Sequence, residues 1–487
     1  PHAPTVHAPL GHDADLPVMK ERRRRVLLLG GLGVPSLVVL IALASGPTDL
    51  EGADPEGLHA RPPILNLCRR ALHLAVTMTP VLCVAPAAYA MPSLLTPTAH
   101  ALVVNALERS GAAFIKWGQW ASTRPDLLPR RLCDALSVLH SGAPAHSFEL
   151  TRAEVTRAVG KPLFEYFESF EQTPIASGSI GQVHLAWLHG KPVAVKVRHP
   201  GVELELQTDF YLMSWAAWAV QRLPGLGWLD AQSTVRQFAS TLVAQVDLQE
   251  EGRNLRQMRR NFRLWSDVSF PKPLLASPAV LIETYAPGLP VTRFTVAGGR
   301  QLLSAAQRRL IVRRGLEIYL KMLLLDNLMH ADMHPGNILF DASRDVLRMV
   351  DLGLVATLSA DERRNFIGFL QALGNGDGRA AARCVLGWSR AQACRGDECT
   401  RGFEDSMGQM FDQICRGYGT GIHLGDVLRA TLDLVRRYKV TIGANYMTLV
   451  VNALCLEGMA RELEPDYNVM DAAEPLLSMY GRYPRPP

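Results

Sequence analysis

The stretch His330-Ala-Asp332-Met-His-Pro-Gly-Asn337, followed by Val350-Asp351-Leu-Gly353, decides the fold of this chain. An Asp and an Asn separated by four residues, with an Asp-x-Gly after a short apolar run, is the spacing with which a kinase-like fold places its base and its metal ligands. The pattern predicts that Asp332 aligns or deprotonates an acceptor. It predicts Asn337 and Asp351 as ligands of Mg²⁺.

Length and composition indicate a folded protein of two or three domains. The chain has 487 residues, of which 48% are apolar, and this is ample for globular cores. Its net charge of +5 owes much to one run, residues 20–25, so no nucleic-acid partner is expected. The eight cysteines are scattered, which predicts free thiols in a reducing compartment.

Residues 26–45 are uncharged and apolar, close to the ~20 residues that span a bilayer core. Four arginines, residues 22–25, precede them, as in a membrane anchor held by positive charge. An uncleaved targeting segment or a Gly-rich hydrophobic tail is the alternative, because three glycines and a proline weaken a helix here. A second apolar stretch, residues 71–91, contains two prolines and a histidine, which favours a membrane-surface helix over a second span.

Residues 101–139 have the apolar periodicity of amphipathic helix and contain Lys116-Trp-Gly118-Gln119. A Lys and a Gln three residues apart lie at neighbouring positions on one helix face. Gly118 lets another backbone or a phosphate approach closely. From composition alone, a surface helix that ends at Pro125 explains this segment equally well.

Two predicted strands, joined by a turn at residues 189–191, form a glycine-containing hairpin. The first begins after a loop that fills two of the three glycine positions of a kinase loop, and the second carries Val-Ala-Val-Lys196. Such a loop lays backbone N–H groups over phosphates, and the lysine reaches the α and β phosphates. The predicted nucleotide-binding residues are Ala176, Ser177, Gly178, Ser179, Ile180, Gly181, Val183 and Lys196.

A helix is predicted over residues 231–262, with Asp247 and Glu251 four residues apart on one face. In a kinase-like fold the helix after the lysine strand supplies an acid that pairs with that lysine, so Glu251 is expected to contact Lys196. A solvated acidic face is the alternative. Residues 280–285 are expected to form a strand that leads into the hinge between two lobes.

Helices are expected to dominate beyond the hinge, and the C-terminal end is expected to be loop. The predicted helices span residues 308–325, 360–373, 378–388, 400–416, 425–438 and 446–461. The whole pattern predicts an α+β, bilobal protein-kinase-like fold with a small antiparallel sheet lobe, a helical lobe and an N-terminal helical extension. The expected domains are a targeting or anchor region (1–62), the helical extension (63–150), the N-lobe (151–288) and the C-lobe (289–487).

From about residue 100 to about residue 470, the sequence resembles the UbiB-type, aarF-domain-containing atypical kinase family. Gln245 favours the branch of the family's second kinase. The motifs that carry the resemblance are Lys116-Trp-Gly118-Gln119 with Ser122 to Pro129, Ser179-Ile-Gly-Gln-Val-His184, His330 to Asn337, and Leu456 to Arg461 with Pro465-Asp466.

This resemblance implies a KxGQ helix, with Lys116, Gly118 and Gln119, that folds over the active site in place of a peptide groove. Ordinary protein phosphorylation is therefore disfavoured. The resemblance implies ATP or ADP and Mg²⁺ as cofactors, and ATPase activity that supports ubiquinone or other isoprenoid-lipid metabolism. It also implies the mitochondrial inner membrane as location, single-pass or peripheral. The implied partners are membrane lipid or an isoprenoid quinone precursor, and ubiquinone-synthesis proteins.

Two departures from the family pattern stand out. The alanine that is thought to shape nucleotide preference is Gly178 here, so ATP and ADP both stay open. The ExD motif, which engages the KxGQ helix, reads Gln245-Val-Asp247, and the glutamine keeps the hydrogen-bonding reach of Glu but loses a charge. A pseudokinase scaffold and a phosphotransferase that acts on a small molecule or lipid are the alternative functions.

Overall fold

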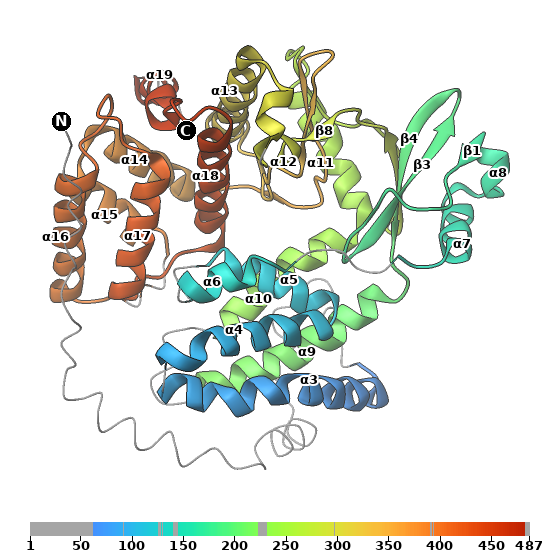
Figure 1. Cartoon of the computed structure of the whole chain (residues 1–487), viewed down its shortest axis with the longest axis horizontal. Coiled ribbons are helices and arrows are strands. Elements are labelled where there is room, and N and C mark those ends of the chain that lie inside the picture. Colours follow the sequence, from blue (N-terminus) through green and yellow to red (C-terminus); the bar gives the residue numbers. More distant parts are fainter. Residues whose placement is uncertain are drawn as a thin grey trace. The chain divides into compact units, whose positions relative to one another are not determined.

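The computed structural model describes residues 62–482 apart from residues 91, 125–127, 129, 140–144, 223–230, 297, 390–391 and 393. The chain divides into two compact units, Pro1–Ser110 and Gly111–Pro487. In the first unit, helices α3 (Ile64–Ala90) and α4 (Pro92–Arg109) pack against each other (Figure 1).

Helix α3 leaves apolar side chains exposed, among them Leu65, Leu72 and Val76. In residues 62–482, so far as they are described, no helix combines the length and apolar character that a membrane span needs. The predicted anchor at 26–45 lies outside the described residues.

The second unit begins with helices α5 (Ala112–Ser122) and α6 (Arg130–Leu136), followed by a small lobe built on a sheet (Figure 1). The strand order is β1-β3-β4-β7-β6, with β2 on β3. The predicted hairpin is confirmed: its turn places His189 and Gly190 at φ 52° and 69°, the left-handed pair that matches strand twist. The strands are β1 (Ser169–Phe170), β2 (Ala176–Ser177), β3 (Gly181–Leu188), β4 (Lys191–Arg198), β6 (Pro273–Ala276) and β7 (Val280–Thr284).

The side chains of β4 alternate between the two faces of the sheet, because successive side chains of a strand point to opposite sides. The three valines 193, 195 and 197 are buried in one cluster with Val155 of helix α7 (Phe148–Val159) and Leu163 of α8 (Leu163–Tyr166). The alternate residues, Ala194 and Lys196, therefore face the opposite side of the sheet.

The predicted helix over residues 231–262 is wrong as a single element. It is divided into α10 (Ala231–Val246) and α11 (Leu248–Asn261), and α9 (Val202–Gln221) precedes them. Asp247 lies at the break in an extended conformation and caps α11, where its carboxylate accepts a 2.8 Å hydrogen bond from Gln249 N. A short acidic side chain is favoured at an N-cap, so Asp247 does not share a helix face with Glu251.

The large lobe is mainly helical, as predicted (Figure 1). The C-terminal loop expected around Pro484 lies outside the described residues, and the helix over residues 469–482, which contains Pro475, was not predicted. The helices are α12 (Thr292–Thr295), α13 (Ala305–Lys321), α14 (Ala360–Asn375), α15 (Gly378–Leu386), α16 (Asp397–Ile414), α17 (Leu424–Tyr438), α18 (Ala444–Leu463) and α19 (Val469–Arg482), with η3 (Gly299–Leu302) and η4 (Met322–Asp326).

Short strands frame the predicted active-site loop in this lobe. Among the described residues they form a sheet in the order β5-β11-β10-β8 and a pair, β12-β9. The strands are β5 (Val268–Ser269), β8 (Leu289–Pro290), β9 (Met329–His330), β10 (Ile338–Asp341), β11 (Val346–Met349) and β12 (Val355–Ala356). Asp332 and Asn337 lie between β9 and β10, and Asp351 lies between β11 and β12.

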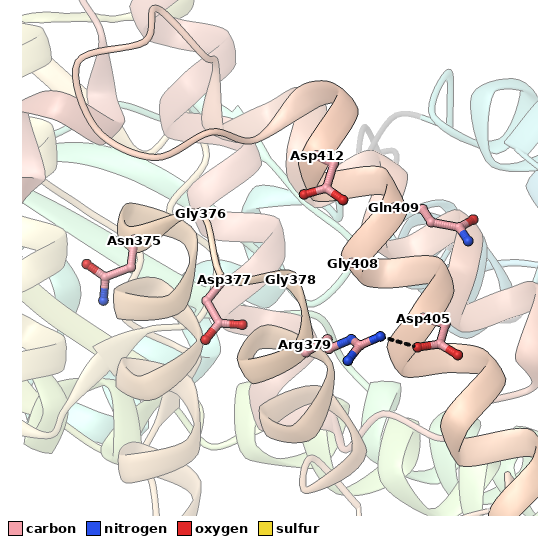
Figure 2. Close-up of a pocket in the computed structure, with 9 residues that line it drawn as sticks. All are labelled: Asn375, Gly376, Asp377, Gly378, Arg379, Asp405, Gly408, Gln409 and Asp412. Atoms are coloured by element: carbon pink, nitrogen blue, oxygen red, sulfur yellow. Dashed lines mark hydrogen bonds and ion pairs between the residues drawn. The ribbon is translucent and has the colours of Figure 1, made fainter.

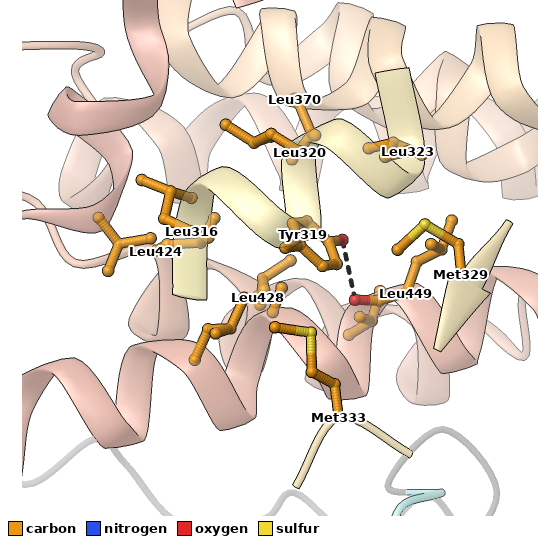
Figure 3. Packing of buried hydrophobic residues seen from close by; sticks show 14 of the residues in the cluster. Leu316, Tyr319, Leu320, Leu323, Met329, Met333, Leu370, Leu424, Leu428 and Leu449 are labelled. Atoms are coloured by element: carbon orange, nitrogen blue, oxygen red, sulfur yellow. Dashed lines mark hydrogen bonds between the residues drawn. The ribbon is translucent and has the colours of Figure 1, made fainter. Parts of the chain in front are cut away.

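The core of the large lobe holds this loop against helices α13 and α18. Leu316, Leu323, Met329 and Met333 are buried together, and Figure 3 shows Tyr319 among them. The Tyr319 hydroxyl donates a 3.1 Å hydrogen bond to the Leu449 carbonyl, so its one buried polar group is satisfied.

The prediction that all cysteines are free thiols is wrong for one pair. A disulfide joins Cys394 and Cys399, whose Cα atoms are 5.7 Å apart. They are the two cysteines with the smallest separation in the sequence, but spacing alone does not show that two Cβ atoms face each other.

Candidate active site

Lys196 joins the two lobes through two carboxylates. Its Nζ lies 2.7 Å from Glu251 Oε2 and 3.0 Å from Asp351 Oδ1. Burial opposes the charge of Lys196, but the two carboxylates outweigh it and raise the lysine pKa. The three groups that the sequence picked out on β4, on α11 and after β11 therefore meet at one place.

Asp351 is held in the left-handed region, at φ 58°, which non-glycine residues adopt rarely. The charge of Lys196, with smaller contributions that include Lys116, lowers the pKa of Asp351 below its usual range. The side chain of Asp351 is 52% exposed and is therefore open to a ligand. Lys116 of α5 is close enough to act on this carboxylate.

The loop between β9 and β10 is fixed by its own side chains. The Asn337 Nδ2 donates to Asp332 Oδ2 and to the Asp332 carbonyl, each at 3.1 Å. Buried His330 contacts the Val350 carbonyl through Nε2 at 3.2 Å, and its Nδ1 accepts from Asp332 N at 3.1 Å. His334 Nδ1 accepts from Gly336 N at 3.0 Å, so both histidines make hydrogen bonds that fix the loop.

The glycine loop is a tight turn between β2 and β3. Gly178 N donates to the Gly181 carbonyl at 2.9 Å, and Ala176 pairs with Val183. Gly181 is required by close packing, since a Cβ atom there would lie 2.5 Å from the Val197 carbonyl oxygen on β4. The loop is thus pressed against the strand that carries Lys196.

The residues of this site fit a nucleotide and Mg²⁺. Within the described residues, the hydroxyl oxygens of Ser177 and Ser179 are buried and have no hydrogen-bond partner, which is unfavourable unless a ligand supplies one. The carboxylate of Asp351 and the amide oxygen of Asn337 are the hard oxygen donors that Mg²⁺ prefers. Because the Asn337 nitrogen faces Asp332, its oxygen points away from Asp332.

The residues of the KxGQ segment (116–119) and of the ExD segment (245–247) have different roles in the structure. On α5, Gly118 is buried and Gln119 Nε2 donates to the Leu139 carbonyl at 3.1 Å. A Cβ atom on Gly353 would lie 3.4 Å from Asp351 Oδ1, 3.7 Å from Glu251 Oε2 and 3.9 Å from Gln245 Cγ, so Gln245 borders the ion-pair site. Asp247, in contrast, is used as a helix cap.

Two further asparagines hold the site together, and sequence reasoning missed both. Buried Asn452 on α18 donates to the His330 carbonyl at 2.7 Å and accepts from Met333 N at 3.2 Å. Asn254 on α11 donates to the Leu352 carbonyl at 3.0 Å. Neither lies in a recognisable motif, although Asn254 follows Glu251 by three residues and thus shares its helix face.

Glu283 is a partly buried acid near the same site, also missed from the sequence. On β7 it pairs with Ala194, two residues before Lys196, and its Oε2 has no partner among the described residues. Burial, reinforced by the charge of Glu251, raises the pKa of Glu283 to about 8.

A groove of about 710 Å³ lies elsewhere in the large lobe, where α15 meets α16 (Figure 2). Arg379 and Asp405 form a 2.8 Å ion pair across it. Asp377 uses its carboxylate to cap α15. None of the predicted site residues lines this groove.

The fold and the site define a kinase-like protein: a strand lysine, a helix glutamate, an Asp–Asn loop and a turn aspartate converge between a small sheet lobe and a helical lobe. Comparison with known proteins agrees. The ABC1 atypical kinase-like domain matches residues 138–385. The chain belongs to the UbiB/aarF-type family of ABC1 atypical kinases.

Three relatives illustrate the family. A protein of Dictyostelium discoideum named probable serine/threonine-protein kinase abkC is 31% identical over 77% of this chain and 64% of its own length. A mitochondrial ABC1 family protein of Saccharomyces cerevisiae is 28% identical over 78% of this chain and 68% of its own length. The probable protein kinase UbiB of Marinobacter nauticus is 30% identical over 77% of this chain and 69% of its own length. The chain thus spans slightly less than two thirds of the first of these relatives.

Proposed function

We propose that this protein is a Mg²⁺-dependent, nucleotide-binding ATPase of the atypical kinase type, which supports ubiquinone or related isoprenoid-lipid metabolism. The observation that carries this proposal is the contact of Lys196 with both Glu251 and Asp351. Relatives named UbiB and a mitochondrial relative support a role in the quinone pathway and a place in the mitochondrion, at the inner membrane, single-pass or peripheral. Membrane lipid or an isoprenoid quinone precursor, and ubiquinone-synthesis proteins, are the proposed partners.

In this proposal the lysine places the nucleotide. Glu251 orients Lys196 toward the α and β phosphates, while the backbone and hydroxyls of residues 176–181 cover the phosphates. Asn337 and Asp351 would hold Mg²⁺, which neutralises charge on the phosphate oxygens. Asp332, fixed by Asn337, orients the attacking group and takes its proton.

Lys116 sets the site apart from an open kinase groove. Its charge acts on Asp351, which supports a role of the α5 segment, with Gly118 and Gln119, as a lid over the phosphates. Gln245 borders the same carboxylates and lacks the charge of the family's usual glutamate. This arrangement favours hydrolysis of a nucleotide, or its use with a small lipid-like acceptor, over transfer to a protein chain.

A thermal-shift titration with ATP or ADP and Mg²⁺ tests the assignment. Wild-type protein should be stabilised as nucleotide concentration rises, and Asp351→Asn should lose most of this stabilisation. Equal stabilisation of both proteins would refute the assignment of Asp351.

ATP hydrolysis with lipid present then separates the alternatives. Loss of turnover in Asp332→Asn supports the ATPase. Nucleotide binding without any turnover in the wild-type protein would indicate a pseudokinase scaffold. Phosphate that appears on an added isoprenoid or small alcohol would indicate a phosphotransferase.

A further inference from the structure

A chain of hydrogen bonds links the nucleotide loop to the segment that precedes helix α7. His199, directly after β4, clamps the loop twice: its N–H donates to the Ile180 carbonyl at 2.8 Å and its ring Nε2 contacts the Gly178 carbonyl at 2.9 Å. Its other ring nitrogen, Nδ1, lies 2.7 Å from Nδ1 of His146. The pair of imidazoles therefore ties the loop to His146, which lies more than 30 positions earlier in the chain.

The protons in this chain can be placed so that each contact joins one donor and one acceptor. A carbonyl oxygen can only accept, so His199 carries a proton on Nε2, and in this placement its Nδ1 accepts. His146 must then donate from Nδ1 and accept at Nε2, where the Thr151 hydroxyl lies at 3.0 Å. Thr151 in turn accepts from Gln182 Nε2 at 3.1 Å.

The remaining groups complete the network. His184 Nδ1 donates to the Glu171 carbonyl at 2.8 Å, so its Nε2 accepts from Gln182 Nε2 at 2.9 Å. Gln182 Oε1 accepts from His146 N at 2.9 Å. In this arrangement each of these donors meets an acceptor. Burial, with the neighbouring imidazoles, lowers the pKa of His146 to about 4, and burial lowers the pKa of His184 as well.

The hydrogen bond from His199 to the Gly178 carbonyl also fixes the direction of the next backbone N–H, that of Ser179. In a trans peptide the C=O and the following N–H point in opposite directions. Because His199 holds the Gly178 carbonyl, the N–H of Ser179 points away from His199. A rotated peptide would turn this N–H toward the imidazole and lose the bond. The buried hydroxyl of Ser179, like that of Ser177, has no partner among the described residues.

We propose that His199, oriented by His146, is a positioning residue for the nucleotide: it fixes the Gly178–Ser179 peptide so that the Ser179 N–H and hydroxyl are presented to the phosphates. This inference rests on the proposed nucleotide binding. The chain of hydrogen bonds from Gly178 and Ile180 through His199 to His146, here called the interlock, does not depend on it. His199 does not contact the reacting atoms. Its effect is on how tightly nucleotide binds, with little effect on turnover at saturation.

Two variants test the role. His199→Phe keeps a ring and removes both nitrogens, and it should raise KM for ATP about three- to tenfold while kcat changes less than about twofold. His199→Gln keeps an amide N–H donor for the Gly178 carbonyl and should recover much of the lost affinity. His189→Asn, which removes an exposed imidazole from the β3–β4 turn, is the matched control and should match wild type.

Hydrogen exchange on the nucleotide-free protein separates this inference from the proposed function. Amides of residues 177–181 should exchange faster in His199→Phe and in His146→Phe than in wild type, with the large lobe unchanged. Equal exchange in all three proteins would overturn the interlock. If wild type binds nucleotide and His199→Phe has an unchanged KM, or if kcat falls as much as kcat/KM, the positioning role is wrong. Faster exchange without nucleotide binding by wild type would refute the proposed function and leave the interlock standing.

Discussion

Asn452, on helix α18, donates a 2.7 Å hydrogen bond to the carbonyl of His330, 122 residues earlier in the chain. Its Oδ1 accepts from Met333 N at 3.2 Å, so one amide holds both sides of Asp332. The position of the proposed base therefore depends on a helix that contributes no side chain to the chemistry.

Replacement of Asn452 by Leu should destabilise the protein and impair turnover. It keeps a similar volume but leaves a buried carbonyl and a buried N–H without partners, at a cost of roughly 2–4 kcal/mol. Chemical denaturation and ATP hydrolysis measure the two effects. Asn445→Ala on the same helix is the control, because its bonds to Thr357 O and Glu362 are partly exposed. Equal losses in both variants would contradict the special role of Asn452.

Replacement of Lys196 by Met should cost more stability than replacement of Lys196 and Glu251 together. The single change leaves the Glu251 side chain, only 3% exposed, without its cation, which costs about 3–5 kcal/mol in such sites. Adding Glu251→Gln removes the unpaired charge and should restore part of that loss. Urea denaturation of the wild type, both single variants and the double variant gives the coupling energy. Additive effects would mean that the pair does not act as a unit.

The two glycines of the nucleotide loop should respond differently to Ala. Gly181→Ala places a methyl group 2.5 Å from the Val197 carbonyl oxygen, so β4 must shift, at about 1–3 kcal/mol. Gly178→Ala meets the Gly181 carbonyl oxygen at 3.6 Å, an ordinary contact, and should fold as the wild type does. Melting temperatures with and without ATP and ADP test both. A larger loss for Gly178→Ala would reverse the expected order.

Glu283→Gln should flatten the dependence of stability on pH. The pKa of Glu283 is raised from 4.5 to about 8, so the folded protein binds more protons than the unfolded chain between these values, and stability falls as pH rises across this window. The amide cannot ionise and lacks this loss. The difference in melting temperature, variant minus wild type, should grow from pH 5 to pH 8. Glu462→Gln, an exposed change, is the control and should show a constant difference.

The sequence predicts those parts of the site that are built from residues close together in the chain. The β3–β4 hairpin follows from alternating apolar residues around a glycine turn, and the Asp332–Asn337 loop follows from its motif. Lys196 and Glu251 were expected to pair from their order along the chain, and they lie 2.7 Å apart. The roles of all these residues stay predictions until nucleotide binding is measured.

Other features depend on contacts between distant parts of the chain, which spacing does not encode. Asn452 and Glu283 have no motif, and only folding places them beside His330 and Ala194. The sequence does not reveal the helix break at Asp247, because the apolar periodicity continues through it. The break is marked only by the side chain of Asp247, which caps the start of α11.

Helix α11 carries Glu251 and Asn254 one turn apart, and both side chains reach the segment after β11: the first through Lys196 to Asp351, the second directly to the Leu352 carbonyl. Swinging this helix outward would break both links at once. The contacts that would shape the proposed nucleotide site therefore form when the protein folds rather than when nucleotide arrives. Such a pre-organised site is suited to constant operation, and control of its activity would have to act on access to the site instead of on its assembly.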